Sequence, residues 1–398
     1  MISPKDALRL VLDATTELPP ETRDLPEVAG LVLAESVCAD MDQPPFDRAM
    51  MDGYAVPQGA AGTQLPVVEL VAAGQASTVS LTEGECAEIM TGAPCPSGTW
   101  AVVPKEHVHL DENTVQFPPQ IRERQNIAPR GSDRRQGDAI LQPGDRLDPL
   151  AIAVLASVGK TSVRVVRPAK VAIVTTGAEV VSPDRQPEPA QIRDANGPML
   201  SAMARATRAA RVVHVHVTDE MDAITDTIAR HADFDVLVLT GGVSAGRFDF
   251  VPDALKKQRA EIVFHKVGQK PGKPLLFARR ESQLIFGLPG HPLATHFSFH
   301  RYVATAIHKM QGQAAGRPVL TGRLTKPVKR RKDRTAFVLG RADDRNDSGG
   351  IPQVEPLPGR STADIFRAVA PNCYLEVPTG PDSIPAGDPI QFTRLDPI

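Results

Sequence analysis

Residues 170–177 read Lys-Val-Ala-Ile-Val-Thr-Thr-Gly, and residues 235–242 read Asp-Val-Leu-Val-Leu-Thr-Gly-Gly. Each stretch is a short apolar run that ends at glycine, which predicts a buried strand followed by a tight turn. Segments that suit helices follow both runs, around 198–210 and 251–258. Because strands that alternate with helices indicate right-handed βαβ units, we expect residues 168–312 to form a doubly wound, mainly parallel α/β sheet.

The segments on either side of this α/β region have a different texture. Ser3 and Pro4 suit the cap and first turn of an N-terminal helix. Residues 43–137 and 313–398 consist of short apolar runs broken by Gly and Pro, which predicts two small β-rich domains. The whole chain is therefore expected to be a multidomain α/β plus β protein.

The composition argues against several classes of protein. The chain of 398 residues has a formal charge of −2, 4% aromatic residues and one Trp, which disfavours binding to nucleic acid. Four cysteines without a C-x-x-C pair disfavour a structural zinc site and a disulfide framework. We see no signal peptide and no apolar stretch of 18 residues, so we expect a cytoplasmic protein without a membrane partner.

Three glycine loops follow predicted strands of the α/β region. They begin at Gly177, at Gly241-Gly242 and at Gly287, the last reading Gly-Leu-Pro-Gly-His-Pro. Glycines let backbone N–H groups approach an anion closely, and ligands of open parallel sheets bind at the carboxyl ends of the strands. None of the loops matches a Walker motif or G-x-G-x-x-G, which disfavours ordinary ATP hydrolysis and NAD binding. The alternative for any single loop is a tight strand-to-helix turn.

Two basic segments suit an anion. Lys270-Pro-Gly-Lys273 places two lysines in a stiff turn, where both ammonium groups can be held near one anion at a reduced ordering cost. The run 329–334 ends at Arg334, just before a predicted strand. The alternative interpretation is a solvated turn and a solvated hairpin.

Acidic residues occur in the same loops, namely Glu179, Asp194 and Asp249. Carboxylates beside an anion site favour Mg²⁺ that bridges to phosphate, or acid–base chemistry. Each residue alone is more often a cap or a turn residue.

Taken together, the motifs resemble the molybdopterin molybdenumtransferase family, which includes the MoeA proteins and the E domain of gephyrin. The resemblance covers nearly the whole chain and rests on the order and spacing of six motifs. These are Pro45-Phe-Asp with Met51-Asp-Gly-Tyr-Ala-Val, Ile89-Met-Thr-Gly-Ala-Pro, Val174-Thr-Thr-Gly-Ala-Glu, Leu239-Thr-Gly-Gly-Val-Ser-Ala-Gly, Lys270-Pro-Gly-Lys-Pro and Gly287-Leu-Pro-Gly-His-Pro.

The resemblance implies an elongated homodimer of four-domain subunits. Domain I would comprise residues 1–42 and 138–167, domain II 43–137, domain III 168–312 and domain IV 313–398. The implied reaction inserts molybdenum from molybdate into adenylylated molybdopterin with the help of Mg²⁺ and releases AMP, which completes the molybdenum cofactor. The cleft would lie between the α/β domain of one subunit and the β-rich domain of the other.

The resemblance also assigns roles to residues whose local sequence alone would not justify them. It implies catalytic roles for Asp52, Asp133 and Glu179 and Mg²⁺ binding by Asp194 and Asp249. It implies substrate or anion binding by Thr91, Gly241, Gly242, Ser244, Lys270, Lys273, Pro274, Pro289, Pro292, Arg334 and Ser361.

The chain departs from the family pattern at several positions of the motifs. Ala178 stands where an Asp is usual, Arg247 where an acidic residue is common, His291 where an Asn is usual and Ala294 where a Ser is usual. These changes make the predicted site more positive. A catalytically altered paralogue that binds molybdopterin as a scaffold, or a nucleotide transferase on the same fold, are therefore the alternatives to an active enzyme.

Overall fold

The computed structural model describes residues 1–243, 249–346, 350–357, 359 and 361–395. The chain divides into two compact units. Unit 1 comprises Met1–Arg23, Gly30–Ala34 and Arg164–Ile398, and unit 2 comprises Asp24–Ala29 and Glu35–Val163. Within the described residues, no helix is long and apolar enough to cross a lipid bilayer.

A six-stranded sheet forms the centre of unit 1. In spatial order its strands are β16 (Arg211–Val217), β13 (Lys170–Thr176), β17 (Val236–Thr240), β21 (Gln283–Leu288), β20 (Leu276–Arg280) and β18 (Glu261–His265). The first four are parallel, and β20 and β18 run antiparallel to their neighbours. The predicted doubly wound, mainly parallel α/β fold is confirmed.

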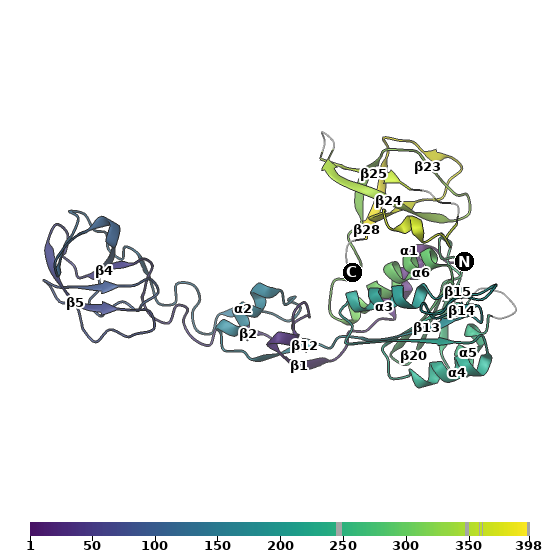
Figure 1. The fold of residues 1–398 in the computed structure, drawn as a ribbon, viewed down its shortest axis with the longest axis horizontal. Helices are drawn as coiled ribbons and strands as arrows, with labels where there is room; N and C mark the ends of the chain where they lie inside the picture. Colours follow the sequence, from purple (N-terminus) through teal and green to yellow (C-terminus); the bar gives the residue numbers. More distant parts are fainter. Residues whose placement is uncertain (244–248, 347–349, 358, 360, 396–398) are drawn as a thin grey trace. The chain divides into compact units, whose positions relative to one another are not determined.

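Helices cover both faces of this sheet, as Figure 1 shows. One face carries α1 (Pro4–Asp13), α3 (Asn196–Ala206), α6 (Pro292–Ser298), a π-helical turn (Phe299–Val303) and α7 (Ala304–Met310), and the other carries α4 (Met221–Arg230) and α5 (Val251–Lys257). Side chains of a strand point alternately to the two faces, so Ile173 joins the first core and Ala172 the second. Burial on both faces explains why these strands read as continuous apolar runs.

The C-terminal part of unit 1 is a small β-barrel. Its strands are β22 (Leu320–Leu324), β24 (Thr335–Asn346), β25 (Pro352–Pro356), β26 (Cys373–Val377) and β28 (Pro389–Arg394). The order β24-β25-β22-β28-β26 closes because β26 also pairs with β24. The two-residue strand β19 (Gln269–Lys270) pairs with β24, so the predicted lysine turn attaches directly to the barrel.

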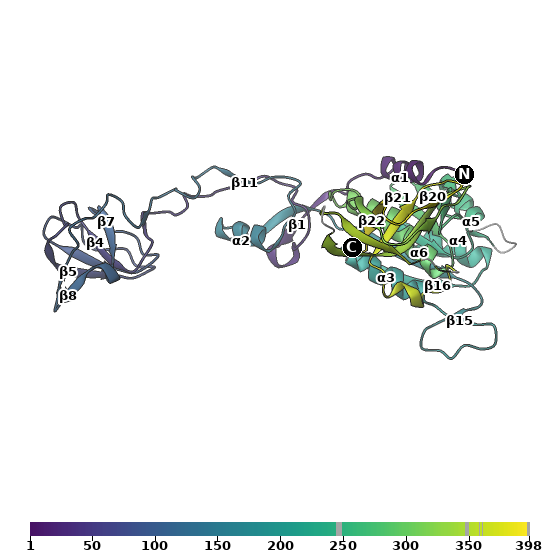
Figure 2. The same cartoon turned by 90° about the horizontal axis from the view of Figure 1, so that it is seen from above.

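Unit 2 contains another six-stranded sheet and one α-helix. The sheet order is β7 (Ala101–Pro104), β4 (Gly53–Val56), β6 (Cys86–Ile89), β5 (Gln64–Val71), β9 (Thr114–Gln116) and β8 (His109–Asp111). Figure 2 shows β7 and β4 towards one edge of this sheet and β8 at the other. The side chain of Asp148 caps α2 (Pro149–Ser157) by accepting a hydrogen bond from the backbone of Ala151. The β-rich character predicted for 43–137 agrees with these strands.

The remaining regular elements are short. Two-stranded pairs are β1 (Pro20–Asp24) with β12 (Ser162–Val166), β2 (Val37–Cys38) with β11 (Ala139–Leu141), β3 (Arg48–Ala49) with β10 (Ile127–Ala128), β14 (Val180–Val181) with β15 (Ile192–Arg193), and β23 (Val328–Lys329) with β27 (Ser383–Ile384). Single 3₁₀ turns cover Leu25–Glu27, Lys105–His107 and Phe366–Ala368.

Candidate active site

The carboxyl ends of three adjacent parallel strands bring the predicted glycine loops together. The backbone N–H of Gly241, after β17, donates to the carbonyl of Leu288 at the end of β21, with an N···O distance of 3.3 Å. Gly241 has a φ of +95°, and a Cβ there would lie 2.6 Å from Oγ1 of Thr176. Only glycine fits this left-handed, crowded position without strain. The loops after β13, β17 and β21 therefore meet at one edge of the sheet.

Asn196, the first residue of α3, ties two of these loops together. Its Nδ2 donates to the carbonyl oxygen of Gly290 at 2.7 Å and to Oγ1 of Thr240 at 3.3 Å. Among the described residues, Oδ1 of Asn196 and Oγ1 of Thr176 are buried without a hydrogen-bond partner. Because buried polar atoms are rarely left unpaired, these two oxygens are notable as unsatisfied acceptors at this edge of the sheet.

Asp194 lies beside this edge in a closed network. Its side chain is 5% exposed and accepts hydrogen bonds from the backbone of Gly197 at 2.8 Å and from Oγ1 of Thr175 at 2.8 Å, and Nε2 of His214 lies 3.2 Å away. Burial alone would raise its pKa, but the hydrogen bonds, led by that of His214, outweigh burial and lower the pKa to about 2. Asp194 is therefore ionised, and its two oxygens already have three partners.

The other predicted metal and acid–base residues belong to two further loops. Glu179 is exposed and follows Gly177, and Asp249 is half-buried just before α5. Ser244 and Arg247 lie outside the described residues. The described residues contain no group of three His, Cys, Asp or Glu side chains that could hold a metal ion. Binding of Mg²⁺ by Asp194 and Asp249 stays a prediction.

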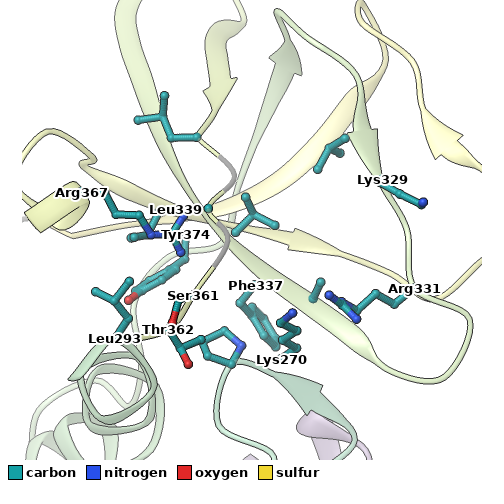
Figure 3. A pocket seen from close by; sticks show the side chains of 16 residues that line it. Lys270, Leu293, Lys329, Arg331, Phe337, Leu339, Ser361, Thr362, Arg367 and Tyr374 are labelled. Atoms are coloured by element: carbon teal, nitrogen blue, oxygen red, sulfur yellow. The ribbon is translucent and has the colours of Figure 1, made fainter. Parts of the chain in front are cut away.

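A cavity of about 380 Å³ opens between α6, β19 and the barrel. Four cationic side chains line it, those of Lys270, Lys329, Arg331 and Arg367, and the described lining contains no carboxylate. Figure 3 shows Lys270 and Arg331 on the side of Phe337, and Arg367 across the cavity. We call this cavity the cation pocket. Its positive charge suits an anion.

The charges in the cation pocket act on Lys270. Burial and the neighbouring cations Arg331, Arg334 and Arg367 lower the pKa of its ammonium group. Lys273 and Arg334, the other predicted anion ligands, do not line the pocket. Lys273 is exposed, and Nε of Arg334 donates to the adjacent carboxylate of Asp333 at 2.7 Å. The lysine turn thus contributes one of its two ammonium groups to the pocket wall.

The lysine turn and the Gly-Leu-Pro-Gly-His-Pro loop connect through α6. Gly272 packs so closely on this helix that a Cβ there would lie 2.7 Å from Oγ of Ser298 and 3.8 Å from the carbonyl oxygen of Ala294. Pro292 begins α6, and the carbonyl of the buried Pro289 accepts from Oγ1 of Thr240. The Gly-Leu-Pro-Gly-His-Pro loop and the cation pocket are therefore joined by one short helix.

Residues 361 and 362 form part of the pocket wall facing α6. Ser361 and Thr362 both line the cation pocket. Nδ1 of His291 lies 2.8 Å from Oγ1 of Thr362, and the backbone N–H of Leu293 donates to the carbonyl of Thr362. Pro274 is half-buried and follows the exposed Lys273 without reaching the pocket.

Unit 2 brings together two residues that lie far apart in the sequence. Oδ1 of Asp52 accepts from the backbone N–H of Thr91 at 2.7 Å and from its Oγ1 at 2.6 Å, and Lys105 lies 3.9 Å from Oδ2. These hydrogen bonds lower the pKa of Asp52. Asp133 is exposed, and its backbone N–H donates to the carbonyl of Gln43. The catalytic roles of Asp52 and Asp133 stay predictions.

Sequence reasoning missed several residues of the cation pocket. Lys329 and Arg331 belong to the basic run 329–334, from which the sequence predicts only Arg334 as an anion ligand. Thr362 follows the predicted ligand Ser361 and belongs to none of the motifs. Arg367 gives no sequence signal, because it follows an irregular segment and belongs to no motif.

Comparison with known proteins agrees with this architecture. Family models match residues 2–159 (MoeA N-terminal region, domains I and II), 172–309 (probable molybdopterin-binding domain) and 321–395 (MoeA C-terminal region, domain IV). A molybdopterin molybdenumtransferase of Staphylococcus aureus is 30% identical, with 98% of this chain and 94% of the relative covered. The chain belongs to the molybdopterin molybdenumtransferase (MoeA) family. This match supports a role in molybdenum cofactor biosynthesis.

Two further relatives support the same assignment. The molybdopterin molybdenumtransferase of Staphylococcus epidermidis is 34% identical over 80% of this chain and 78% of its own length. The crystal structure of the molybdopterin biosynthesis MoeA protein from Pyrococcus horikoshii OT3 superimposes with a TM-score of 0.80 at 26% identity, covering 99% of this chain and 100% of the other. The multidomain α/β plus β fold of the MoeA family is thus present over the whole chain.

Proposed function

We propose that this protein is an active molybdopterin molybdenumtransferase. It inserts molybdenum from molybdate into adenylylated molybdopterin and releases AMP. The cation pocket is the observation that carries the proposal, because molybdate is a dianion and the pocket offers four cations without an opposing carboxylate in its described lining.

The carboxyl edge of the sheet suits the phosphate-bearing part of the substrate. Glycines at 241 and 242 let the backbone approach a phosphate closely, and the unpaired oxygens of Thr176 and Asn196 suit polar hydrogens of a bound ligand. Since α6 starts at this edge and also contacts the cation pocket, a substrate anchored at the edge can extend towards the oxyanion. Proximity of this kind is a large part of catalysis in group transfer.

The predicted acidic ligands Asp194 and Asp249 meet part of the requirements of a Mg²⁺ site. Mg²⁺ sites of phosphate-handling enzymes use one or two carboxylates together with waters and substrate phosphates. Asp194 is ionised although its oxygens already have three partners, and Asp249 is half-buried just before α5. As the family resemblance implies, these two carboxylates would hold the ion. Bound there, Mg²⁺ would neutralise charge that develops at the phosphoanhydride.

The oligomeric state and the compartment belong to the same proposal. A cytoplasmic homodimer of four-domain subunits is expected from the family resemblance, and in such a dimer Asp52, Thr91 and Asp133 would serve catalysis or substrate binding. Light scattering of the purified full-length protein tests this part, and a monomeric mass at working concentration would contradict it.

One assay separates the proposed activity from its alternatives. The full-length protein is supplied with adenylylated molybdopterin, Mg²⁺ and molybdate, and AMP release is followed. Molybdate-dependent AMP release supports the proposal, whereas no release above background favours a molybdopterin-binding scaffold. Consumption of ATP with molybdopterin in the absence of molybdate would favour a nucleotide transferase.

A further inference from the structure

Arg367 is a half-buried cation with two nitrogen atoms that its local contacts leave unpaired. It lies in the 3₁₀ turn Phe366–Ala368 and lines the cation pocket. Its Nε and Nη1 atoms are buried and have no hydrogen-bond partner among the described residues. Burying N–H groups without a partner costs free energy, so such groups persist mainly where a ligand completes them.

The guanidinium group of Arg367 packs against the backbone of Gly359. A Cβ at Gly359 would lie 1.3 Å from Nη1 and 1.7 Å from Cζ of Arg367. The arginine therefore packs directly on the backbone at this position, and any side chain at 359 would displace it. This packing limits the orientations of the guanidinium before a ligand arrives, which lowers the ordering cost of binding.

Arg367 and Lys270 approach the cation pocket from different walls. Lys270 comes from β19, whereas Arg367 comes from the C-terminal segment and lies beside Leu339 and Tyr374 (Figure 3). The charge of Arg367 contributes to the lowered pKa of Lys270, so the two cations interact across the cavity. An anion between them would relieve this repulsion.

We propose that Arg367 is a specificity-determining residue of the cation pocket: its guanidinium and the Lys270 ammonium clamp a doubly charged tetrahedral oxyanion from two walls. The identity of this oxyanion as molybdate rests on the proposed function, but the clamp itself does not. Guanidinium presents several N–H groups in a fixed plane and retains its charge, so it selects dianions over monoanions more strongly than a single ammonium group.

The first test compares oxyanion binding with stability. Full-length wild-type protein, Arg367→Met and Lys270→Ala are titrated with molybdate, sulfate and perchlorate by calorimetry, and their melting temperatures are measured with and without each anion. Arg367→Met should weaken molybdate and sulfate binding roughly 10- to 100-fold. Its melting temperature without oxyanion should equal or exceed that of the wild type, because two buried guanidinium nitrogens without partners are removed.

An arginine that only stabilised the fold would give the opposite result in both measurements. If Arg367→Met lowered the melting temperature without anion and left the dissociation constants unchanged, the clamp would be disproved. The control Arg279→Ala removes an arginine of β20 that pairs with Glu261 outside the pocket, and it should change neither quantity.

Two further variants test the clamp without relying on Arg367→Met. Arg367→Lys should retain part of the affinity, because the charge remains while the planar array of donors is lost. Gly359→Ala should reproduce the weakened binding of Arg367→Met although the arginine is intact, since the new methyl group displaces the guanidinium. Wild-type affinity for molybdate in Gly359→Ala would contradict the proposal.

The outcomes also distinguish this inference from the proposed function. Binding of oxyanions that depends on Arg367, in a protein that releases no AMP, would support the clamp and overturn the activity. Molybdate-dependent AMP release with an unchanged KM for molybdate in Arg367→Met would support the activity and overturn the clamp.

Discussion

Nδ1 of His291 lies 2.8 Å from Oγ1 of Thr362, which joins the loop before α6 to the wall of the cation pocket. The sequence predicts His291 only as a departure from the usual Asn of this motif. In the structure the two residues connect the carboxyl edge of the sheet with the segment that carries Ser361. The contact thus links the two halves of the proposed substrate site.

Replacing this histidine should affect oxyanion use more than turnover. His291→Ala removes one hydrogen bond that positions the 361–362 segment, worth about 1 kcal/mol, so the KM for molybdate should rise about fivefold. The kcat should stay near that of the wild type, and His291→Gln should restore part of the KM. Steady-state AMP release measures both constants, with the exposed His109→Ala as a control. A fall in kcat at constant KM would contradict the positioning role.

The lysine turn permits a direct comparison of two neighbouring residues. Lys270 lines the cation pocket and Lys273 does not, so Lys270→Ala should weaken molybdate binding about 10- to 100-fold. Lys273→Ala should weaken binding only about two- to threefold, because its exposed charge acts through solvent. Calorimetric titration with molybdate checks both values. Equal losses in the two variants would show that both ammonium groups reach the anion.

Asp194 should make the stability of the protein depend on pH. Its pKa is lowered from 3.8 to about 2, which corresponds to about 2 kcal/mol of stability. Because the pKa is depressed in the folded state, this contribution is present above pH 4 and is lost as the pH falls towards 2. Urea denaturation should find Asp194→Asn less stable than wild type at pH 7, with a difference that shrinks below pH 4. A difference that stays constant from pH 7 to pH 3 would contradict this account.

Gly241 should tolerate no side chain at the strand-to-loop junction. Alanine would be strained at a φ of +95° and would also meet Oγ1 of Thr176 at 2.6 Å, so Gly241→Ala should lose about 2–3 kcal/mol of stability. Gly137 is a matched control, with a φ of +88° and nothing within 4 Å of an added Cβ. Gly137→Ala should cost only about 1 kcal/mol, from backbone strain alone. Chemical denaturation measures both, and equal losses would exclude a contribution from the contact with Thr176.

The sequence by itself determined the architecture of the central region. The apolar runs at 170–176 and 236–240 could be recognised as buried parallel strands because both of their faces are covered, and that burial leaves a continuous hydrophobic signature. The glycines at 177 and 241 could be placed at the ligand-binding edge because that edge is fixed by strand direction. Ser3 could be recognised as a helix cap because capping is a local interaction.

Only the tertiary structure decided which side chains form the cation pocket. Lys270 and Lys273 look equivalent in the sequence, but the pairing of β19 with β24 presents the first at the pocket and leaves the second in solvent. Arg334 pairs with Asp333, whereas Arg367, which belongs to no motif, packs its guanidinium group on the backbone of Gly359. Local spacing specifies strands, turns and caps, because their hydrogen bonds join near neighbours. A pocket built by segments from β19, α6 and the barrel depends on packing between residues about 100 positions apart, which no short pattern records.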